Sequence, residues 1–437
     1  MNKQIISVAL AIAFSISGYA QSGTNSPYSQ YGLGVLSDQS HGFNSGMNGV
    51  GLSYRGGDVV NTLNPASYSA IDSLTMVFDV GLSGQITSFK EGNVKRNAKN
   101  ADVEYAVGSF RLLPKVGAAF GLMPFSNIGY NYSATNNLNI EEGTIITETY
   151  TGSGGLHQAF FGLGWNIVKP LSLGVNVSYI WGTYNRSVSS SANTSNINKL
   201  SREYSCTINT YDVTFGAQWK QKIAKQDYLT LGAIVGIGHE LKANPTCYTI
   251  NNNSTSNTND TTSMTIQNGL SLPMTYGVGL GWNHGSKLYV GADFQMQQWG
   301  KIDFPDYFQG DDGKMNYALR SGLLRDRYKV NIGADYQPNT TGRRLYQRVH
   351  YRLGAGYATP YYNINGKEGP KEFSLSGGFG IPLGSVYWNR QGHMRPTLNI
   401  GVQWARSSAT NMVTENTFRI NIGLTFNERW FAKWKVD

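Results

Sequence analysis

The chain has 437 residues, a formal net charge of +9, 14% charged residues, 12% aromatic residues and 52 glycines. The basic residues are scattered and form no Lys/Arg run, which argues against nucleic acid as a partner. The residue patterning does not change along the chain, so we expect one large unit rather than several soluble domains.

An export signal is predicted over residues 1–20. Met1-Asn2-Lys3 precedes the apolar run Ile5 to Ile16, and Gly18-Tyr19-Ala20 provides the small residues of a cleavage site. Gln21 rather than Cys follows that site, so a lipid-anchored N-terminus is not expected. The signal predicts an exported protein.

Residues 21–72 form the second predicted unit. They are rich in glycine, weakly charged and without the periodicity of a strand, as in Gly46-Met47-Asn48-Gly49-Val50-Gly51-Leu52 and Asn64-Pro65-Ala66. Low-charge segments with aromatic residues usually pack against something. We expect a hatch, or plug, in the cavity that the following strands enclose; the alternative is an unpacked periplasmic leader.

Residues 73–437 read as strands from one end to the other. In the last run, Thr417–Phe426, Phe418, Ile420 and Ile422 point to one side, and the residues between them are polar or small. No stretch after the signal is apolar for long enough to be a membrane helix. The sequence therefore predicts an all-β fold, a transmembrane antiparallel β-barrel of about 14 strands in the outer membrane of a Gram-negative cell.

The expected strands can be marked by this alternation and by the turn residues between them. They are Leu74–Phe89, Val103–Leu113, Val116–Thr135, Ile145–Val168, Leu171–Ser190, Ser205–Lys222, Tyr228–Ala243, Thr262–Asn283, Lys287–Gly300, Tyr328–Pro338, Val349–Tyr362, Phe373–Tyr387, Pro396–Ser407 and Thr417–Asn427.

The connections between these strands alternate in length. Those after even-numbered strands are tight, for instance Pro114-Lys115, Lys169-Pro170 and His284-Gly285-Ser286, whereas Ser191–Tyr204 and Asn244–Thr261 are long and polar. Outer-membrane barrels have short periplasmic turns and long extracellular loops. The long connections are therefore expected to face the outside of the cell.

The architecture and several short motifs resemble the FadL/TodX family of outer-membrane transport proteins. The resemblance rests on Gly46–Leu52, on Asn64-Pro65-Ala66, and on the late segments Asp326–Tyr336 and Tyr351–Tyr357. It implies passive uptake of hydrophobic small molecules, and a hatch that includes Gly46, Gly49, Gly51, Asn64, Pro65 and Ala66.

Two further features belong to this resemblance. In the family, an inward kink in the third strand opens a lateral exit, and the third strand here contains Pro124, which lacks a backbone N–H and breaks pairing locally. Pro124 is therefore the candidate lateral gate, and a simple bulge is the alternative. The segments Pro27–Gly32 and Glu428–Trp434 look like features of Bacteroidetes relatives.

The predicted long loops depart from the family pattern. They are rich in Ser, Thr and Asn rather than greasy, at 191–200 and 251–263, which puts uptake of long acyl chains in doubt. A second hypothesis is a structural subunit of a multiprotein outer-membrane complex, for secretion or barrel assembly, without transport activity. Expected partners are outer-membrane lipid and lipopolysaccharide, with either a hydrophobic ligand or other outer-membrane proteins and lipoproteins.

Other chemistry finds little support in the sequence. Cys206 and Cys247 fall near one predicted barrel end, so they form either a disulfide between loops or two separate thiols. The six histidines are dispersed, and the aspartates at 303, 306, 311 and 312 do not have the spacing of a calcium loop. We expect no catalytic residues, no metal site and no cofactor.

Overall fold

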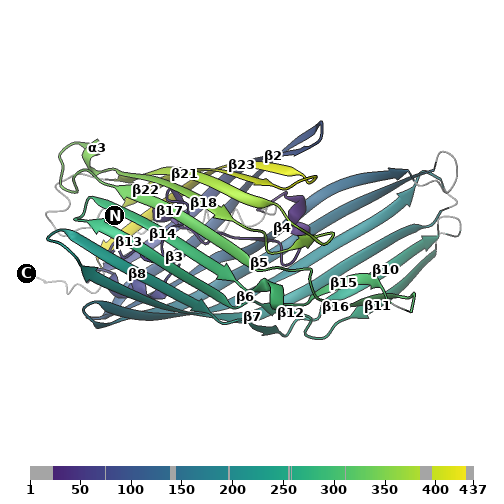
Figure 1. Cartoon of the computed structure of the whole chain (residues 1–437), viewed down its shortest axis with the longest axis horizontal. Coiled ribbons are helices and arrows are strands. Elements are labelled where there is room, and N and C mark those ends of the chain that lie inside the picture. Colours follow the sequence, from purple (N-terminus) through teal and green to yellow (C-terminus); the bar gives the residue numbers. More distant parts are fainter. Residues whose placement is uncertain are drawn as a thin grey trace, which may run out of the picture.

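The computed structural model describes residues 23–429 apart from 74, 138–143, 195–196, 254–255, 257, 311 and 384–395. Fourteen antiparallel strands form one closed barrel, and β2 pairs with β23 to close it (Figure 1). The predicted fold class is confirmed. The predicted signal peptide and the tail from Trp430 onward lie outside the described residues.

The barrel strands keep the order of the chain. They are β2 (Thr75–Glu91), β3 (Val94–Leu113), β4 (Val116–Asn137), β5 (Ile145–Val168), β6 (Leu171–Ala192), β7 (Lys199–Lys222), β8 (Asp227–Gly236), β13 (Thr275–His284), β14 (Leu288–Gln297), β17 (Arg327–Tyr336), β18 (His350–Ala358), β21 (Lys371–Pro382), β22 (Thr397–Ser408) and β23 (Thr414–Arg429).

Side-chain alternation explains why these segments form a barrel wall. In β14, Val290 and Phe294 are 41% and 42% exposed on the outer face, whereas Tyr289 and Asp293 are 4% exposed on the inner face. An apolar outer face suits hydrocarbon, and the closed hydrogen-bond ladder leaves no strand edge in that layer. No helix among the described residues is both long and apolar enough to cross a membrane.

The two ends of the barrel differ. At the turn end, residues 114–115, 169–170 and 285–287 make short turns, and the connection from β17 to β18 holds α3 (Leu345–Arg348). The opposite loop end carries most of the additional elements. These are β9 (His239–Leu241), β10 (Thr246–Asn253), β11 (Thr258–Thr265), β12 (Leu270–Leu272), η3 (Trp299–Lys301), β15 (Phe304–Gln309), β16 (Met315–Arg320), β19 (Asn363–Ile364) and β20 (Lys367–Glu368).

The wall is much taller on one side than on the other. Strands β4 to β7 contain 22 to 24 residues each, whereas β8, β13, β14 and β17 contain 10. About 9–11 residues suffice to cross a membrane. The loop-end halves of β4–β7, with β10 paired to β7 and β11 paired to β10, form a projecting wall at the right of Figure 1.

This wall corrects several predicted boundaries. The expected loop Asn244–Thr261 contains β10 and part of β11, and the expected link between the first two strands is only residues 92–93. The expected strand Thr262–Asn283 is divided among β11, β12 and β13. In β11 nearly every residue on both faces is polar, so the alternation that identifies a strand disappears there.

Candidate functional site

The N-terminal segment, residues 23–73, lies inside the barrel and carries η1 (Pro27–Gln30), β1 (Val35–Leu36), α2 (Gly42–Ser45) and η2 (Pro65–Ala70). Phe43, Met47, Val50 and Leu52 are at most 1% exposed. These side chains are therefore as inaccessible as the core of a soluble protein. The predicted boundary at residue 72 and the role of a hatch stay predictions.

The predicted glycines of this segment lie at close contacts with the wall. A Cβ on Gly46 would lie 3.0 Å from the Cα of Gly378, and Gly49 has a φ of +77°, which favours glycine. The N–H groups of Gly51 and Leu52 both donate to one carboxylate oxygen of Asp293, at 2.7 and 2.9 Å. Asp293, on β14, thus anchors the turn that these glycines make.

The Asn64-Pro65-Ala66 step makes a second anchor. The side chain of Asn64 accepts a hydrogen bond from the N–H of Ala66 at 3.1 Å, so it caps η2. Its amide group donates to the carbonyl oxygens of Leu52, at 2.8 Å, and Ala217, at 3.1 Å. All six residues proposed for the hatch therefore lie in the lumen.

A buried ionic network on the wall escaped sequence analysis. Arg352 donates to Asp335 at 3.1 Å and to Asn399 at 2.6 Å, and its guanidinium also lies 3.5 Å from the carbonyl oxygen of Gly42 in α2. Arg352 and Asp335 are 4% and 5% exposed. The sequence signal for this network was an Arg and an Asp at inward-facing strand positions. That signal was not sufficient, because these side chains are buried by the N-terminal segment that fills the lumen.

A second set of charges lies at the loop end of the lumen. Lys329 on β17 pairs with Asp38 of the N-terminal segment at 2.6 Å, and Arg419 on β23 approaches the same carboxylate at 4.0 Å. Ser26 donates to Glu415 at 2.6 Å. These contacts tie the N-terminal segment to β17 and β23.

Two cavities of about 140 and 180 Å³ remain beside this segment, and both are lined by Leu36, Ser37, Asp38 and Arg327. The larger one is also lined by charged side chains of the wall. These are Asp102, Glu104, Glu372, Glu415 and Arg419. The walls of this larger cavity suit water and ions better than an apolar solute, because unpaired buried polar groups are costly. The smaller cavity is also lined by apolar side chains, among them Met123, Phe125 and Phe160.

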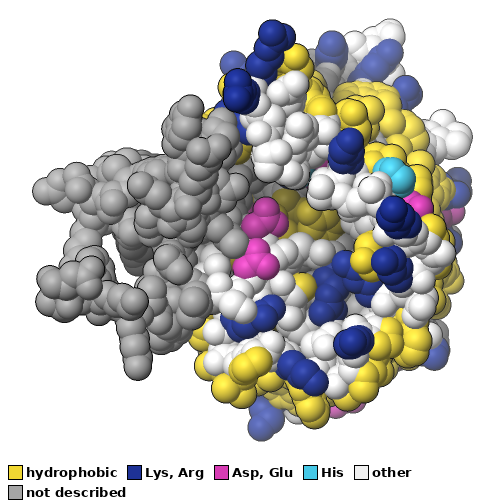
Figure 2. Space-filling model, turned by 90° about the vertical axis from the view of Figure 1, so that its left-hand side faces the viewer, with side chains coloured by type: hydrophobic (Ala, Val, Ile, Leu, Met, Phe, Trp, Pro, Cys, Tyr) yellow, Lys and Arg dark blue, Asp and Glu magenta, His cyan; other side chains and the backbone are white. Residues whose placement is uncertain are grey.

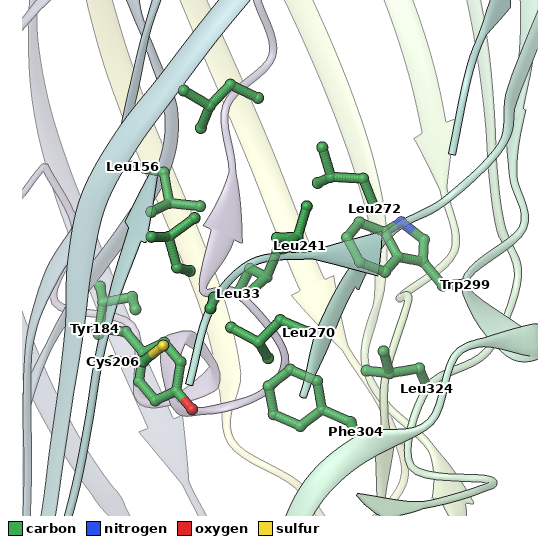
Figure 3. Close-up of a cluster of buried hydrophobic side chains, with 14 of the residues drawn as sticks. Leu33, Leu156, Tyr184, Cys206, Leu241, Leu270, Leu272, Trp299, Phe304 and Leu324 are labelled. Carbon is green, nitrogen blue, oxygen red and sulfur yellow. The ribbon is translucent and has the colours of Figure 1, made fainter. Parts of the chain in front are cut away.

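Above these cavities, apolar side chains from distant segments close the loop end. We call this set the cap cluster (Figure 3). It comprises Leu33, Ile128, Tyr130, Leu156, Ile180, Tyr184, Cys206, Ile208, Leu241, Ala243, Leu270, Leu272, Trp299, Phe304, Leu324 and Tyr361. Trp299 and Leu33 are each 1% exposed. The protein's own side chains thus occupy the most apolar part of the lumen.

Pro124 lies at the base of a seam between β3 and β4. The two strands pair only from Leu113 and Val116 up to Ala106 and Leu122. Toward the loop end β3 continues beside β2 and β4 beside β5, and the β4–β5 register shifts between Pro124 and Ser126. Pro124 therefore accompanies both a bulge and a seam, and its role as a gate stays a prediction.

The N-terminal segment covers this seam from the inside. On one side, Gln85 of β2 donates to the carbonyl of Gly23 at 2.9 Å. On the other, β1 pairs with β4, Val35 with Asn127 and Leu36 with Ser126. The side-chain amide of Asn25 also donates to Asn100 of β3, so the segment from 23 to 37 contacts both β3 and β4 where they separate.

Cys206 and Cys247 are both buried and both free in the structure, on the paired strands β7 and β10. Cys247 is opposite Tyr204, so the cysteines are diagonal neighbours on one face. We expect two maleimide labels per chain after unfolding without reductant, and slow labelling before unfolding. Absence of labels until a reductant is added would instead establish a disulfide, the other alternative.

Histidines and acidic residues of the lumen and loops form structural contacts. Burial lowers the pKa of His41 to about 3, so this ring is neutral beside the hydroxyl of Thr62. Within the described ranges, no group of three His, Cys, Asp or Glu residues is arranged to hold a metal ion.

Comparisons with known proteins agree with this architecture. Among solved structures, the monoaromatic hydrocarbon channel CymD has a TM-score of 0.60 at 12% identity, with 92% of this chain and 100% of that chain covered. The Pseudomonas putida toluene transporter TodX gives 0.60 at 15%, covering 91% and 100%, and a Pseudomonas aeruginosa FadL homologue gives 0.60 at 11%, covering 89% and 98%. At these identities the likeness shows the fold.

No curated protein sequence matches the chain. The predicted resemblance to FadL/TodX barrels therefore holds for the fold, while the Bacteroidetes features at the two chain ends stay a prediction. A family model does match the sequence, from residue 1 to residue 437. The chain accordingly belongs to the BamG family.

Proposed function

We propose that this protein is a structural subunit of a multiprotein outer-membrane complex, of the kind that serves secretion or barrel assembly. The single observation that carries the proposal is the filled lumen. The cap cluster fills the loop end of the lumen with apolar side chains, and the larger cavity beside the N-terminal segment is lined by charges such as Asp38 and Arg419. An apolar solute would have to displace packed side chains and then pass buried ions.

The outer surface supports the same proposal. The projecting wall extends far beyond the length needed to cross a membrane, and its side chains are largely Ser, Thr and Asn. Packed strands give such a surface a fixed shape, and partner proteins bind preformed surfaces with little loss of entropy. Membership of the BamG family, rather than of a family of named channels, is in keeping with this role.

Lipid contact is part of the proposal. Hydrophobic side chains cover the flank of the barrel, and Lys and Arg side chains surround its turn end (Figure 2). Exposed lysines lie in or beside the short turns, at Lys115, Lys169, Lys222 and Lys287. They fit the anionic headgroups of the periplasmic leaflet, which attract basic residues near the membrane surface.

Gentle detergent extraction from native membranes tests the proposal. We expect the protein to be recovered with stoichiometric partners, in a particle whose mass exceeds that of one chain. Recovery only as a free monomer, at several detergent concentrations, would contradict it.

Passive uptake of hydrophobic small molecules is the second candidate, because the fold is that of hydrocarbon channels and a seam lies beside Pro124. Replacement of Pro124 by Val restores a backbone N–H at this point. A structural subunit predicts unchanged uptake of a labelled monoaromatic compound by intact cells. A reduction of uptake in the Pro124→Val cells, but not with Pro305→Val in the β15–β16 hairpin, would favour the channel.

A further inference from the structure

Among the residues that the structure describes, the loop-end part of β4 has no strand partner on the side away from β5. β5 pairs with β4 as far as Asn137, whereas on its other side β4 pairs with β3 only up to Leu122 and with the two residues of β1. We propose that the segment Asn131–Asn137, called the β4 edge below, binds an extended segment of a partner protein as an added strand. This inference rests on the proposed function, since it names how a partner of the complex would bind.

The direction of the backbone groups follows from one contact. The hydroxyl of Ser29 accepts from the N–H of Gly129 at 3.2 Å and lies 3.3 Å from its carbonyl oxygen. Both groups of Gly129 therefore point away from β5. Because backbone groups alternate along an antiparallel strand, those of Asn131, Ser133 and Thr135 point the same way.

The chain itself shows that this side of β4 accepts a strand. β1 pairs with it antiparallel, Val35 opposite Asn127 and Leu36 opposite Ser126, and the N–H of Ser37 donates to the carbonyl of Phe125 at 3.0 Å. These contacts lie immediately below the β4 edge. An added strand would continue a ladder that the N-terminal segment begins.

The β4 edge also lacks the features that normally prevent strand addition. Exposed edges are commonly protected by charged side chains or proline. Residues 131–137 contain neither, whereas the facing edge of β3 carries exposed Lys95, Arg96 and Lys99. Of the two edges that meet at the seam, only that of β4 is suited to another polypeptide.

The side chains along the β4 edge indicate the partner's chemistry. Tyr132 lies on the inner face and stacks on Tyr150 of β5, with ring centroids 5.0 Å apart. On the outer face, the hydroxyl of Ser133 lies 3.1 Å from that of Thr149. A partner strand that alternates apolar or aromatic residues with small polar ones, without charges, would match both faces.

Photo-crosslinking in native membranes tests the proposal in the full chain. A photoreactive residue at Asn131, Ser133 or Thr135 is expected to label one segment of one partner. The labelled positions should step by two residues as the probe moves along β4, because opposed strands share that period. A probe at Thr151 is the matched control, because β5 is paired there with β4 on one side and with β6 on the other. It should give little of this adduct.

A backbone substitution gives an independent readout. Ser133→Pro removes an N–H that points away from β5, so the β4–β5 ladder is retained. We expect it to weaken partner recovery roughly fivefold, as loss of one net hydrogen bond predicts, while Ser133→Ala has no such effect.

The outcomes separate the two proposals. Stoichiometric partners without adducts at these positions, adducts without a common register, or adducts only to the chain's own N-terminal segment would overturn strand addition and leave the structural role standing. Recovery as a free monomer would overturn both.

Discussion

Replacement of Gly174 by Val is expected to displace the N-terminal segment from the lumen. A Cβ at this position on β6 would overlap the carbonyl carbon of Pro65, which belongs to the backbone of the N-terminal segment. Backbone atoms cannot rotate away as a side chain does, so the Asn64-Pro65-Ala66 step has to move. Limited proteolysis of the folded barrel should cleave residues 23–72 in the variant and spare them in the wild type.

Gly84 provides the matched control for this substitution. It lies on β2, where an added Cβ would meet no atom within 4 Å, and its side of the strand faces outward. Gly84→Val should therefore resist protease as the wild type does. Equal protection of both variants would show that the N-terminal segment does not pack against β6 as described.

Replacement of Arg352 by Ala is expected to cost about 3–5 kcal/mol of stability, because it leaves the buried carboxylate of Asp335 without its guanidinium partner. The measurement is the thermal transition of the purified barrel, followed by loss of its heat-modifiable mobility on a gel. The substitution also removes a guanidinium that lies 3.5 Å from the Gly42 carbonyl, so the N-terminal segment should become more accessible to protease.

An exposed ion pair serves as the comparison. Arg320 and Asp306 are 3.1 Å apart, with side chains 55% and 32% exposed, in the β15–β16 hairpin. Pairs of this kind contribute about 0–1 kcal/mol, so Arg320→Ala should leave the transition almost unchanged. If Arg352→Ala lost as little stability as Arg320→Ala, the lumen around Arg352 would be hydrated rather than dry.

Much of the barrel could be predicted from the sequence, because strands that cross a membrane have apolar residues facing lipid at every second position. In β14 and β23, every second residue is apolar where hydrocarbon covers it, and that alternation located both strands. The contacts of Gly51 and Asn64 also fell in the region proposed for the hatch, because a weakly charged, glycine-rich segment has to pack against something.

The projecting wall and the seam could not be predicted in the same way. Outside the apolar belt, β11 and the end of β10 are polar on both faces, so no periodicity marks them. The seam exists because β3 and β4 stop pairing with each other beyond Ala106 and Leu122. Which strands pair is determined by the whole sheet and not by the local sequence. Arg352 and Asp335 likewise become partners only through the register of β17 with β18.

Uptake of a labelled monoaromatic compound or fatty acid by intact cells, compared with cells that lack the protein, tests the central claim most directly. A lumen filled by the N-terminal segment and the cap cluster predicts equal rates in the two strains. A saturable component that disappears with the protein, and returns when the wild-type chain is restored, would contradict it.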